Sequence, residues 1–210
     1  MHVPDPRDQK VAYRYFKPFV ERFKGCQSVL DIASGRGFFL ELMKVSGTPA
    51  TGVELDRELV ESCRDRGLSV EQEDFFDYLV EAGPESFDGA HASHIIEHFT
   101  PVQVEKLFSL IGPALKKNSL LIIITPNPAN IRRMVGDFWR DPTHVRPYPA
   151  SAIKKLLGRA GGWEVLEEAE YSDRKPSLVR EILYGIRNTL LGKYWVGDDL
   201  YVIARKVSDR

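Results

Sequence analysis

The segment Val29-Leu-Asp-Ile-Ala-Ser-Gly-Arg-Gly-Phe-Phe39 contains the clearest structural signal in this chain. Its apolar start leads into a run of small residues, and an apolar helical spacing begins at Phe38, so the segment predicts a strand, a tight turn and a helix. Glycine allows a backbone to come close to a bound molecule, and a helix N-terminus presents free N–H groups. We therefore expect a nucleotide-like or carboxylate-bearing ligand at this turn.

A dinucleotide-binding turn is the obvious alternative, but its fingerprint is G-x-G-x-x-G with an acid about 20 residues later. Here the acid ends the strand, and only two glycines follow, in the order Asp-x-Ala-Ser-Gly-Arg-Gly. This order resembles motif I, D/E-x-G-x-G-x-G, of the class I S-adenosylmethionine (SAM)-dependent methyltransferases, with alanine in place of the first glycine. The resemblance implies SAM as the cofactor, and it assigns five residues of the turn to cofactor binding: Asp31, Ala33, Ser34, Gly35 and Gly37.

Two later strand ends also carry acids. Glu54, followed by Leu55, lies 23 positions after Asp31, a separation that fits one helix plus one strand. Such an acid reaches the carboxyl edge of the neighbouring strand, where a carboxylate can accept the hydrogen bonds of a ribose diol. In the methyltransferase pattern, the acid after the third strand accepts from the adenine amino group and its neighbour packs on the ring. Asp74 and Phe75 match these positions, and Asp74 could also cap the following helix.

Residues 87–99, from Phe-Asp to Glu-His-Phe, resemble the fourth strand and following loop of the same superfamily. Ser93 and His94 would then flank the methionine part of the cofactor. The run His94-Ile-Ile-Glu-His98 also matches H-x-x-E-H, an inverted zinc-peptidase motif. That motif needs one helix that holds both histidines on one face. Because a strand precedes this run and Thr100-Pro101 starts a new helix directly after it, we expect no metal site.

Strands alternate with helices as far as a strand at 119–125, and two further strands are expected at 163–171 and 199–206. This rhythm indicates a parallel sheet with both faces covered. We therefore predict an α/β protein. The resemblance to class I methyltransferases further implies their Rossmann-like fold, a seven-stranded, mostly parallel sheet with an antiparallel last strand and helices on both faces.

The chain length of 210 residues fits a single domain spanning residues 1–210. Within it we expect an N-terminal helix over the site in residues 1–25, where Tyr13, Arg14 and Tyr15 either touch the ligand or pack in the core. An acceptor loop is expected at 126–150 and a helical insertion at 173–198. In that insertion, residues 177–191 carry one apolar stripe, which suits packing on the domain, a lid, a homodimer contact or a peripheral membrane contact.

Bulk composition excludes several classes of function. The net charge of −1 gives no reason to expect a nucleic-acid partner. The N-terminus lacks a signal-peptide core, and the longest apolar run, Leu120 to Ile124, is too short to cross a bilayer. Cys26 and Cys63 suggest neither a disulfide framework nor a cysteine-rich metal site. We expect a soluble, cytoplasmic protein.

The region after residue 125 is rich in proline and arginine. Together with Tyr13-Arg-Tyr and the motifs above, T-P-N-P-x-N and F-W-R-D-P-T-H-V-R-P resemble the methyltransferase domains of bacterial O-antigen and surface-polysaccharide modifying enzymes, over roughly residues 10–160. The resemblance implies a glycan or another anionic, sugar-bearing acceptor. Guanidinium groups suit phosphate and carboxylate, so Arg140 and Arg146 are the predicted acceptor-binding residues, whereas Arg132 and Arg133 fit a solvated helix face.

A sugar hydroxyl is a poor nucleophile until its proton is removed, and histidine is the natural base near neutral pH. His144 is the first candidate for this catalytic role and His98 the second. A phosphate acceptor would need no base. Two other functions remain open: methylation of a small metabolite or natural product, and a catalytically silent SAM-binding module that serves a partner protein.

Overall fold

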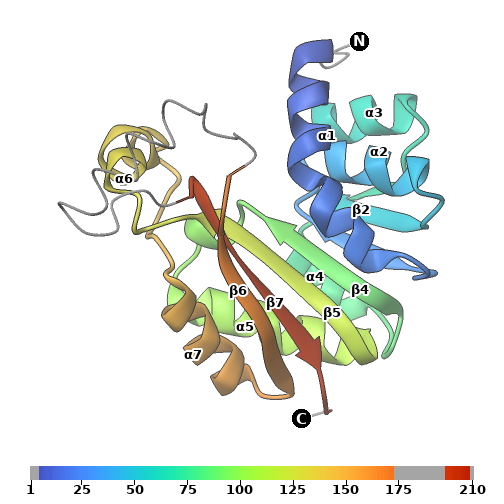
Figure 1. The fold of residues 1–210 in the computed structure, drawn as a ribbon. Coiled ribbons are helices and arrows are strands. Elements are labelled where there is room, and N and C mark those ends of the chain that lie inside the picture. The colour runs from blue at the N-terminus through green and yellow to red at the C-terminus, as the bar shows by residue number, and fades with distance from the viewer. Residues whose placement is uncertain (1–4, 173–196, 209–210) are drawn as a thin grey trace.

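Seven strands form one sheet in the order β3-β2-β1-β4-β5-β7-β6 in the computed structural model, which describes residues 5–172 and 197–208 (Figure 1). The strands are β1 Val29–Ile32, β2 Ala50–Glu54, β3 Val70–Gln72, β4 Phe87–Ser93, β5 Leu115–Pro126, β6 Trp163–Tyr171 and β7 Asp199–Lys206. β7 runs antiparallel to both β5 and β6, and the other neighbouring strands are parallel. This confirms the predicted seven-stranded, mostly parallel sheet with an antiparallel last strand.

The strand order reverses next to β1, which pairs with β2 on one side and with β4 on the other. In register, Asp31 lies beside Gly52 of β2 and His91 of β4. Open α/β sheets bind ligands outside the carboxyl ends of the strands at such a switch point. The glycine-containing turn after β1 lies at this position.

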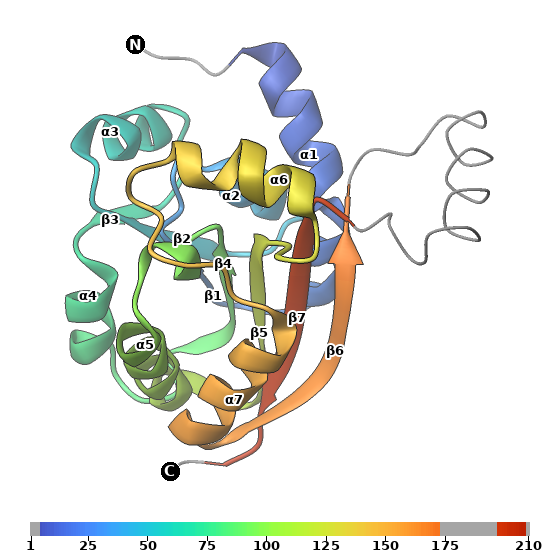
Figure 2. The same cartoon turned by 90° about the vertical axis from the view of Figure 1, so that its left-hand side faces the viewer.

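Helices cover both faces of the sheet (Figure 1, Figure 2). On one face, apolar side chains of the first helices pack against alternate residues of the strands, including Val29 and Ile122. The helices on this face are α1 Pro6–Val20 with the 3-10 turn η1 Glu21–Phe23, α2 Phe38–Val45 and α3 Arg57–Asp65. On the other face Leu30 and Leu121 meet α4 Phe75–Glu81, the 3-10 turn η2 Ile96–His98, α5 Pro101–Ala114 and α7 Ala150–Ala160. Each fully buried aliphatic side chain contributes roughly 1.5–3 kcal/mol.

Polar caps start three of the helices that follow strands. Asp56 Oδ1 accepts from the backbone N–H groups of Glu58 (2.8 Å) and Leu59 (3.1 Å) at the start of α3. Asp74 caps α4 in the same way, and Thr100 forms a capping box with Gln103 on α5. Because Asp56 and Asp74 come two residues after β2 and β3 end, the N-termini of α3 and α4 lie at the edge of the sheet where ligands bind, whereas a loop with the 3-10 turn η2 separates Thr100 from β4.

Most predicted elements are present, and their ends differ at a few places. The helix predicted to start at Thr100-Pro101 ends at Ala114, because the chain joins β5 at Leu115, with Asn118 at a positive φ of 68° before the regular pairing begins. The N-terminal helix expected within residues 1–25 is α-helical from Pro6 to Val20 and continues as the 3-10 turn η1 to Phe23. The predicted helix at 177–191 lies outside the described residues. No helix in the described ranges is long and apolar enough to span a membrane.

Candidate functional site

The turn after β1 has the backbone that its composition predicts. Ala33, Gly35 and Gly37 all have positive φ, of 55°, 53° and 72°. Glycine adopts this conformation freely, whereas alanine pays roughly 1–2 kcal/mol for it. Ser34 donates its backbone N–H to Val53 O at 3.1 Å, and its hydroxyl lies against Gly52, where an added Cβ would come within 2.5 Å of Ser34 Oγ. The turn therefore packs closely on β2.

Glu54, at the end of β2, holds the same turn. Its Oε2 accepts from the backbone N–H of Gly35 at 2.8 Å, and its Oε1 accepts from those of Leu55 and Asp56 at 2.8 and 2.9 Å. A carboxylate offers about four lone-pair sites. One site on Oε2 therefore stays available, and a diol bound to both oxygens would displace a backbone donor.

Asp31 occupies a different environment from Glu54. It is 3% exposed, and its Oδ1 lies 2.7 Å from His91 Nδ1 on β4. The His91 ring stacks on Phe39 with centroids 3.9 Å apart. Burial raises the pKa of Asp31, and the hydrogen bond from His91 only partly opposes this rise. Asp31 thus ties β1 to β4 beneath the turn, and its contact with a cofactor stays a prediction.

The predicted adenine-binding residues lie at the next strand end. Asp74 Oδ1 accepts from Phe76 N at 2.7 Å, so this side chain caps α4. The helix cap was the second role that the sequence suggested for Asp74. The Phe75 ring is buried and packs on Phe76 and Phe99. Leu55 is 66% exposed beside Glu54, which leaves an apolar surface open to a ligand.

The loop after β4 carries Ser93 and His94. Ser93 Oγ is buried and has no hydrogen-bond partner within the part of the chain that the structure describes. His94 has a positive φ of 53°, and its Nε2 lies 3.1 Å from Tyr15 Oη of α1 while its Nδ1 lies 3.3 Å from Glu97 Oε1. Tyr15 also donates to Asp199 Oδ2 at 2.8 Å. The N-terminal helix therefore reaches the site through Tyr15.

Charges in this network determine the protonation of its members. Burial acts to lower the pKa of His94, but the hydrogen bond that His94 donates to Glu97 and the charge of Asp199 raise this pKa above its ordinary value. Burial acts to raise the pKa of Glu97, but the bond to His94 and its charge bring it below the usual range. Arg133 lies 3.0 Å from Asp199 Oδ1 and adds a further cation. Glu97 is therefore an ionised carboxylate in a buried position.

Sequence reasoning missed Asp199 and His91 and placed Arg133 on a solvated helix face. An antiparallel last strand begins at the edge where the parallel strands end, so the predicted topology could have placed Asp199 near the site. His91 required the register between β1 and β4, which composition does not give. Arg133 lies on a short helix, α6 Ile131–Gly136. This helix crosses the end of the sheet at which β6 ends (Figure 2).

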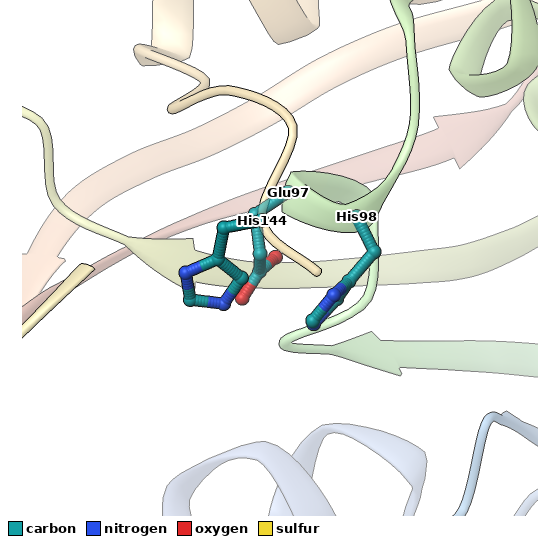
Figure 3. A group of neighbouring side chains, drawn as sticks. All are labelled: Glu97, His98 and His144. Atoms are coloured by element: carbon teal, nitrogen blue, oxygen red, sulfur yellow. The ribbon is translucent and has the colours of Figure 1, made fainter. Parts of the chain in front are cut away.

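A cavity of about 230 Å³ opens beside this network. Its lining is mostly polar and charged: His94, Glu97, His98, Pro126, Arg133, Asp137, Phe138, Asp141 and His144. The two predicted bases, His98 and His144, meet here with ring centroids 4.7 Å apart, and Glu97 lies next to both (Figure 3). His144 comes from the loop after the 3-10 turn η3 Phe138–Arg140. The structure thus brings both candidate bases into one cavity within the predicted acceptor loop.

The two predicted acceptor-binding arginines lie outside the described lining of this cavity. Arg140 is exposed and forms an ion pair with Asp137 at 3.3 Å. The Arg146 guanidinium lies over the Tyr148 ring at 5.2 Å, and its backbone N–H donates to Glu97 O at 3.2 Å. Their contact with an acceptor stays a prediction.

The His94-to-His98 run is not a zinc helix. Its middle forms only the 3-10 turn η2, and α5 starts at Pro101 after the Thr100 cap. His94 turns towards Tyr15, while His98 Nδ1 lies 2.8 Å from Thr143 Oγ1. The geometry of the inverted zinc-peptidase motif is therefore absent from these residues.

The strand order β3-β2-β1-β4-β5-β7-β6, with β7 antiparallel between β5 and β6 and a glycine turn after β1, matches the Rossmann-like class I methyltransferase fold. The family model described as a methyltransferase domain matches residues 7–168, so the chain belongs to this methyltransferase family. No curated protein matches the chain.

Solved structures support the same class. A SAM-dependent methyltransferase from Archaeoglobus fulgidus is 28% identical, with 94% of each chain covered and a TM-score of 0.77. A SAM-dependent methyltransferase from Mesorhizobium loti is 18% identical, with 91% of this chain and 98% of that chain covered and a TM-score of 0.64. A Haloferax volcanii protein in complex with the Trm112 methyltransferase activator is 15% identical, with 96% and 92% covered and a TM-score of 0.73. The last two show the fold alone.

The chain is therefore a SAM-dependent methyltransferase, and SAM is its cofactor. Three features of the structure fit SAM: the lone pair on Glu54 Oε2 that can still accept a hydrogen bond, the exposed apolar surface of Leu55, and the Ser93 hydroxyl, which finds no hydrogen-bond partner among the described residues. They lie at the ends of β2 and β4, on the two sides of β1.

Proposed function

We propose that this chain is an O-methyltransferase that acts on a glycan or another sugar-bearing acceptor. The observation that carries the proposal is the polar cavity that contains His98 and His144. Its described lining has one aromatic ring, Phe138, among three histidines, three carboxylates and one guanidinium. Such a lining suits an acceptor rich in hydroxyl groups better than a flat aromatic one.

The cofactor would be held by residues at three strand ends. Glu54 would accept from the ribose hydroxyls, Asp74 from the adenine amino group, and Ser93 and His94 would contact the methionine part. When bound, SAM supplies a methyl group on a positively charged sulfur, and this sulfur is the leaving group when a nucleophile attacks the methyl carbon in line. The remaining task of the protein is to align the acceptor and to take up its proton.

His144 is the proposed base. Its Nδ1 donates to the carbonyl oxygen of Phe138 at 2.6 Å, because a carbonyl can only accept. This bond leaves the lone pair of the neutral ring on Nε2, which can accept a proton from an acceptor hydroxyl. His98 lies beside it and is the second candidate.

An anionic acceptor requires positive charge that the described cavity wall mostly lacks. Asp137, Asp141 and Glu97 line the cavity, and Arg133 is already paired with Asp199. Arg140 lies next to the wall through its ion pair with Asp137. We therefore place any phosphate or carboxylate of the acceptor outside the cavity, towards Arg140 and Arg146, with a hydroxyl pointing inwards.

Methylation of a small hydroxylated metabolite is the second candidate. The cavity volume of about 230 Å³ favours it, because pockets for drug-sized ligands usually measure about 300–1,000 Å³.

An acceptor panel tests the proposal and separates these alternatives. The panel contains free sugars, sugar phosphates, nucleotide sugars, oligosaccharides and small phenols, and S-adenosylhomocysteine (SAH) release is measured with each. The proposal predicts turnover with sugar-bearing acceptors. Turnover with phenols alone would refute it, and SAH binding without turnover on any acceptor would favour the silent SAM-binding module.

The His144→Ala variant tests the base. With a hydroxyl acceptor, kcat should fall by about 10²- to 10⁴-fold while SAH affinity is retained. With a phosphate acceptor the fall should be much smaller, because that acceptor is already anionic. Glu58→Gln, which removes a carboxylate from an exposed position on α3 outside the cavity lining, serves as the control.

A further inference from the structure

Glu97, His98 and His144 form a compact group of potential metal ligands, which we call the His98–His144–Glu97 cluster. One ligand atom from each residue lies within 4.8 Å of the others. Figure 3 shows the carboxylate between the two imidazole rings. The backbone holds the two segments together, because Val145 N and Arg146 N both donate to Glu97 O, at 2.8 and 3.2 Å.

Hydrogen bonds fix both imidazoles in the tautomer that a metal requires. His144 Nδ1 donates to Phe138 O, so its Nε2 carries the lone pair. Thr143 donates its only hydroxyl proton to Asp141 Oδ1 at 2.5 Å. The 2.8 Å contact between Thr143 Oγ1 and His98 Nδ1 must therefore be donated by the histidine, which leaves its Nε2 free as well. Histidines that bind metals are usually oriented in this way, through the second ring nitrogen.

Glu97 supplies the anionic ligand. It is fully buried, and its Oε2 accepts from Thr125 Oγ1 at 3.0 Å while its Oε1 meets His94 Nδ1 at 3.3 Å. The carboxylate also accepts from its own backbone N–H, and about one of its four lone pairs stays available for a cation. Asp137 and Asp141 also line the cavity, so its electrostatic environment attracts a cation.

We propose that the His98–His144–Glu97 cluster binds a divalent transition-metal ion such as Zn²⁺, through the Nε2 atoms of both histidines and one oxygen of Glu97. The 4.8 Å limit holds for one nitrogen of each ring and one carboxylate oxygen, and three atoms at that separation lie within about 2.8 Å of one point. Small rotations of the three side chains would therefore bring the donor atoms to metal–ligand distances near 2.0–2.2 Å. Two histidines and one carboxylate leave coordination positions open for another ligand.

The metal site is inferred from these residues alone, whereas its role in methyl transfer rests on the proposed function. An acceptor hydroxyl coordinated at an open position would lose its proton to solvent more readily. A metal bound at Nε2 also occupies the lone pair that a base would use. His144 is therefore a ligand in the metal-loaded enzyme and a base only in the metal-free chain. The cation also offsets the carboxylates of the cavity.

Cobalt binding tests the site without any assumption about the acceptor. The untagged full chain is treated with EDTA, dialysed and titrated with Co²⁺, and visible d–d absorption reports coordination. We expect saturation at one equivalent, with affinity lowered by at least about 100-fold in His98→Ala and His144→Ala, since changes at outer-shell partners alone cost 10–100-fold. The control Glu58→Gln removes a carboxylate from an exposed position on α3 outside the cavity lining, so it should bind Co²⁺ within about threefold of wild type.

The Thr143→Val variant covers the case in which a ligand variant fails to fold. It removes the partner that orients His98 and keeps all three ligands, so Co²⁺ affinity should fall by about 10- to 100-fold. Absence of saturable Co²⁺ binding by wild type, or equal binding by wild type, His98→Ala and Thr143→Val, would overturn the inference. SAH binding, measured on the same samples, reports the proposed function separately: SAH binding without Co²⁺ binding removes only the metal site.

Discussion

The Glu54→Gln substitution tests whether Glu54 binds the cofactor ribose or only holds the turn after β1. The glutamine would keep its one oxygen where Oε1 accepts from Leu55 N and Asp56 N. Its amide nitrogen would then face the N–H of Gly35, donor against donor, where Oε2 now accepts at 2.8 Å. The variant therefore loses the link between β2 and the glycine turn, and it also loses one acceptor for the ribose diol.

The magnitude follows from the type of bond. A hydrogen bond to a charged group contributes about 1.5–3 kcal/mol, and about 1.4 kcal/mol corresponds to a tenfold change in affinity. Loss of one such bond to the ribose predicts SAH binding weakened by about 10- to 150-fold. Stability should fall by only about 1 kcal/mol, because Gly35 is half-buried and water can reach its N–H.

Isothermal titration with SAH and urea unfolding measure the two quantities. Glu58→Gln is the matched control: it removes the same charge from an exposed position in the first turn of α3. That variant should bind SAH within about twofold of wild type and lose at most about 1 kcal/mol of stability. If Glu54→Gln binds SAH as tightly as Glu58→Gln does, Glu54 does not hold the ribose.

Three further predictions concern stability, measured by chemical unfolding. Ala33→Gly should stabilise the protein by up to about 1 kcal/mol, because φ is 55° there; a destabilised variant would show that the alanine methyl packs usefully. Hydrogen bonds from Lys116 and from backbone N–H groups lower the pKa of Asp88. The ionised Asp88 therefore stabilises the folded protein by about 1–2 kcal/mol, a figure reduced because Lys116 is half-exposed. This stabilisation is fully present above the ordinary Asp pKa near 3.9 and is lost as the pH falls through the lower pKa of the folded state. Asp88→Asn should therefore lie below wild type at pH 7 and converge with it near pH 2–3, and a gap that is constant with pH would contradict this. Tyr15→Phe should cost about 1–3 kcal/mol, because the buried Asp199 loses a donor, and an unchanged midpoint would mean that Arg133 alone satisfies that carboxylate.

Local sequence patterns were sufficient for the sheet, for the glycine turn after β1 and for the position of Glu54 at the end of β2. The strand, turn and helix at residues 29–39 combine apolar periodicity with small residues, and both signals act over a few neighbours. Glu54 could be placed because one helix and one strand have a nearly fixed combined length. The β7 strand was also predicted, because residues 200–204 form an apolar run rich in strand-forming residues.

Contacts between distant segments could not be predicted in the same way. The Asp31–His91 pair depends on register across two strands, and Tyr15–Asp199 joins residues 184 positions apart. The expected absence of a metal site followed from the missing zinc helix. The residue that gathers with Glu97 and His98 is instead His144, from a loop whose path is fixed by backbone bonds to Glu97 O.

A crystal structure of the full chain with SAH tests the central claim most directly. The account predicts ribose oxygens within hydrogen-bond distance of the Glu54 carboxylate, the amino-acid end beside Ser93, and the sulfur atom facing the cavity that contains His144. SAH bound away from the ends of β1, β2 and β4, or a Glu54 that still accepts all three backbone N–H groups and makes no contact with the ribose, would contradict it.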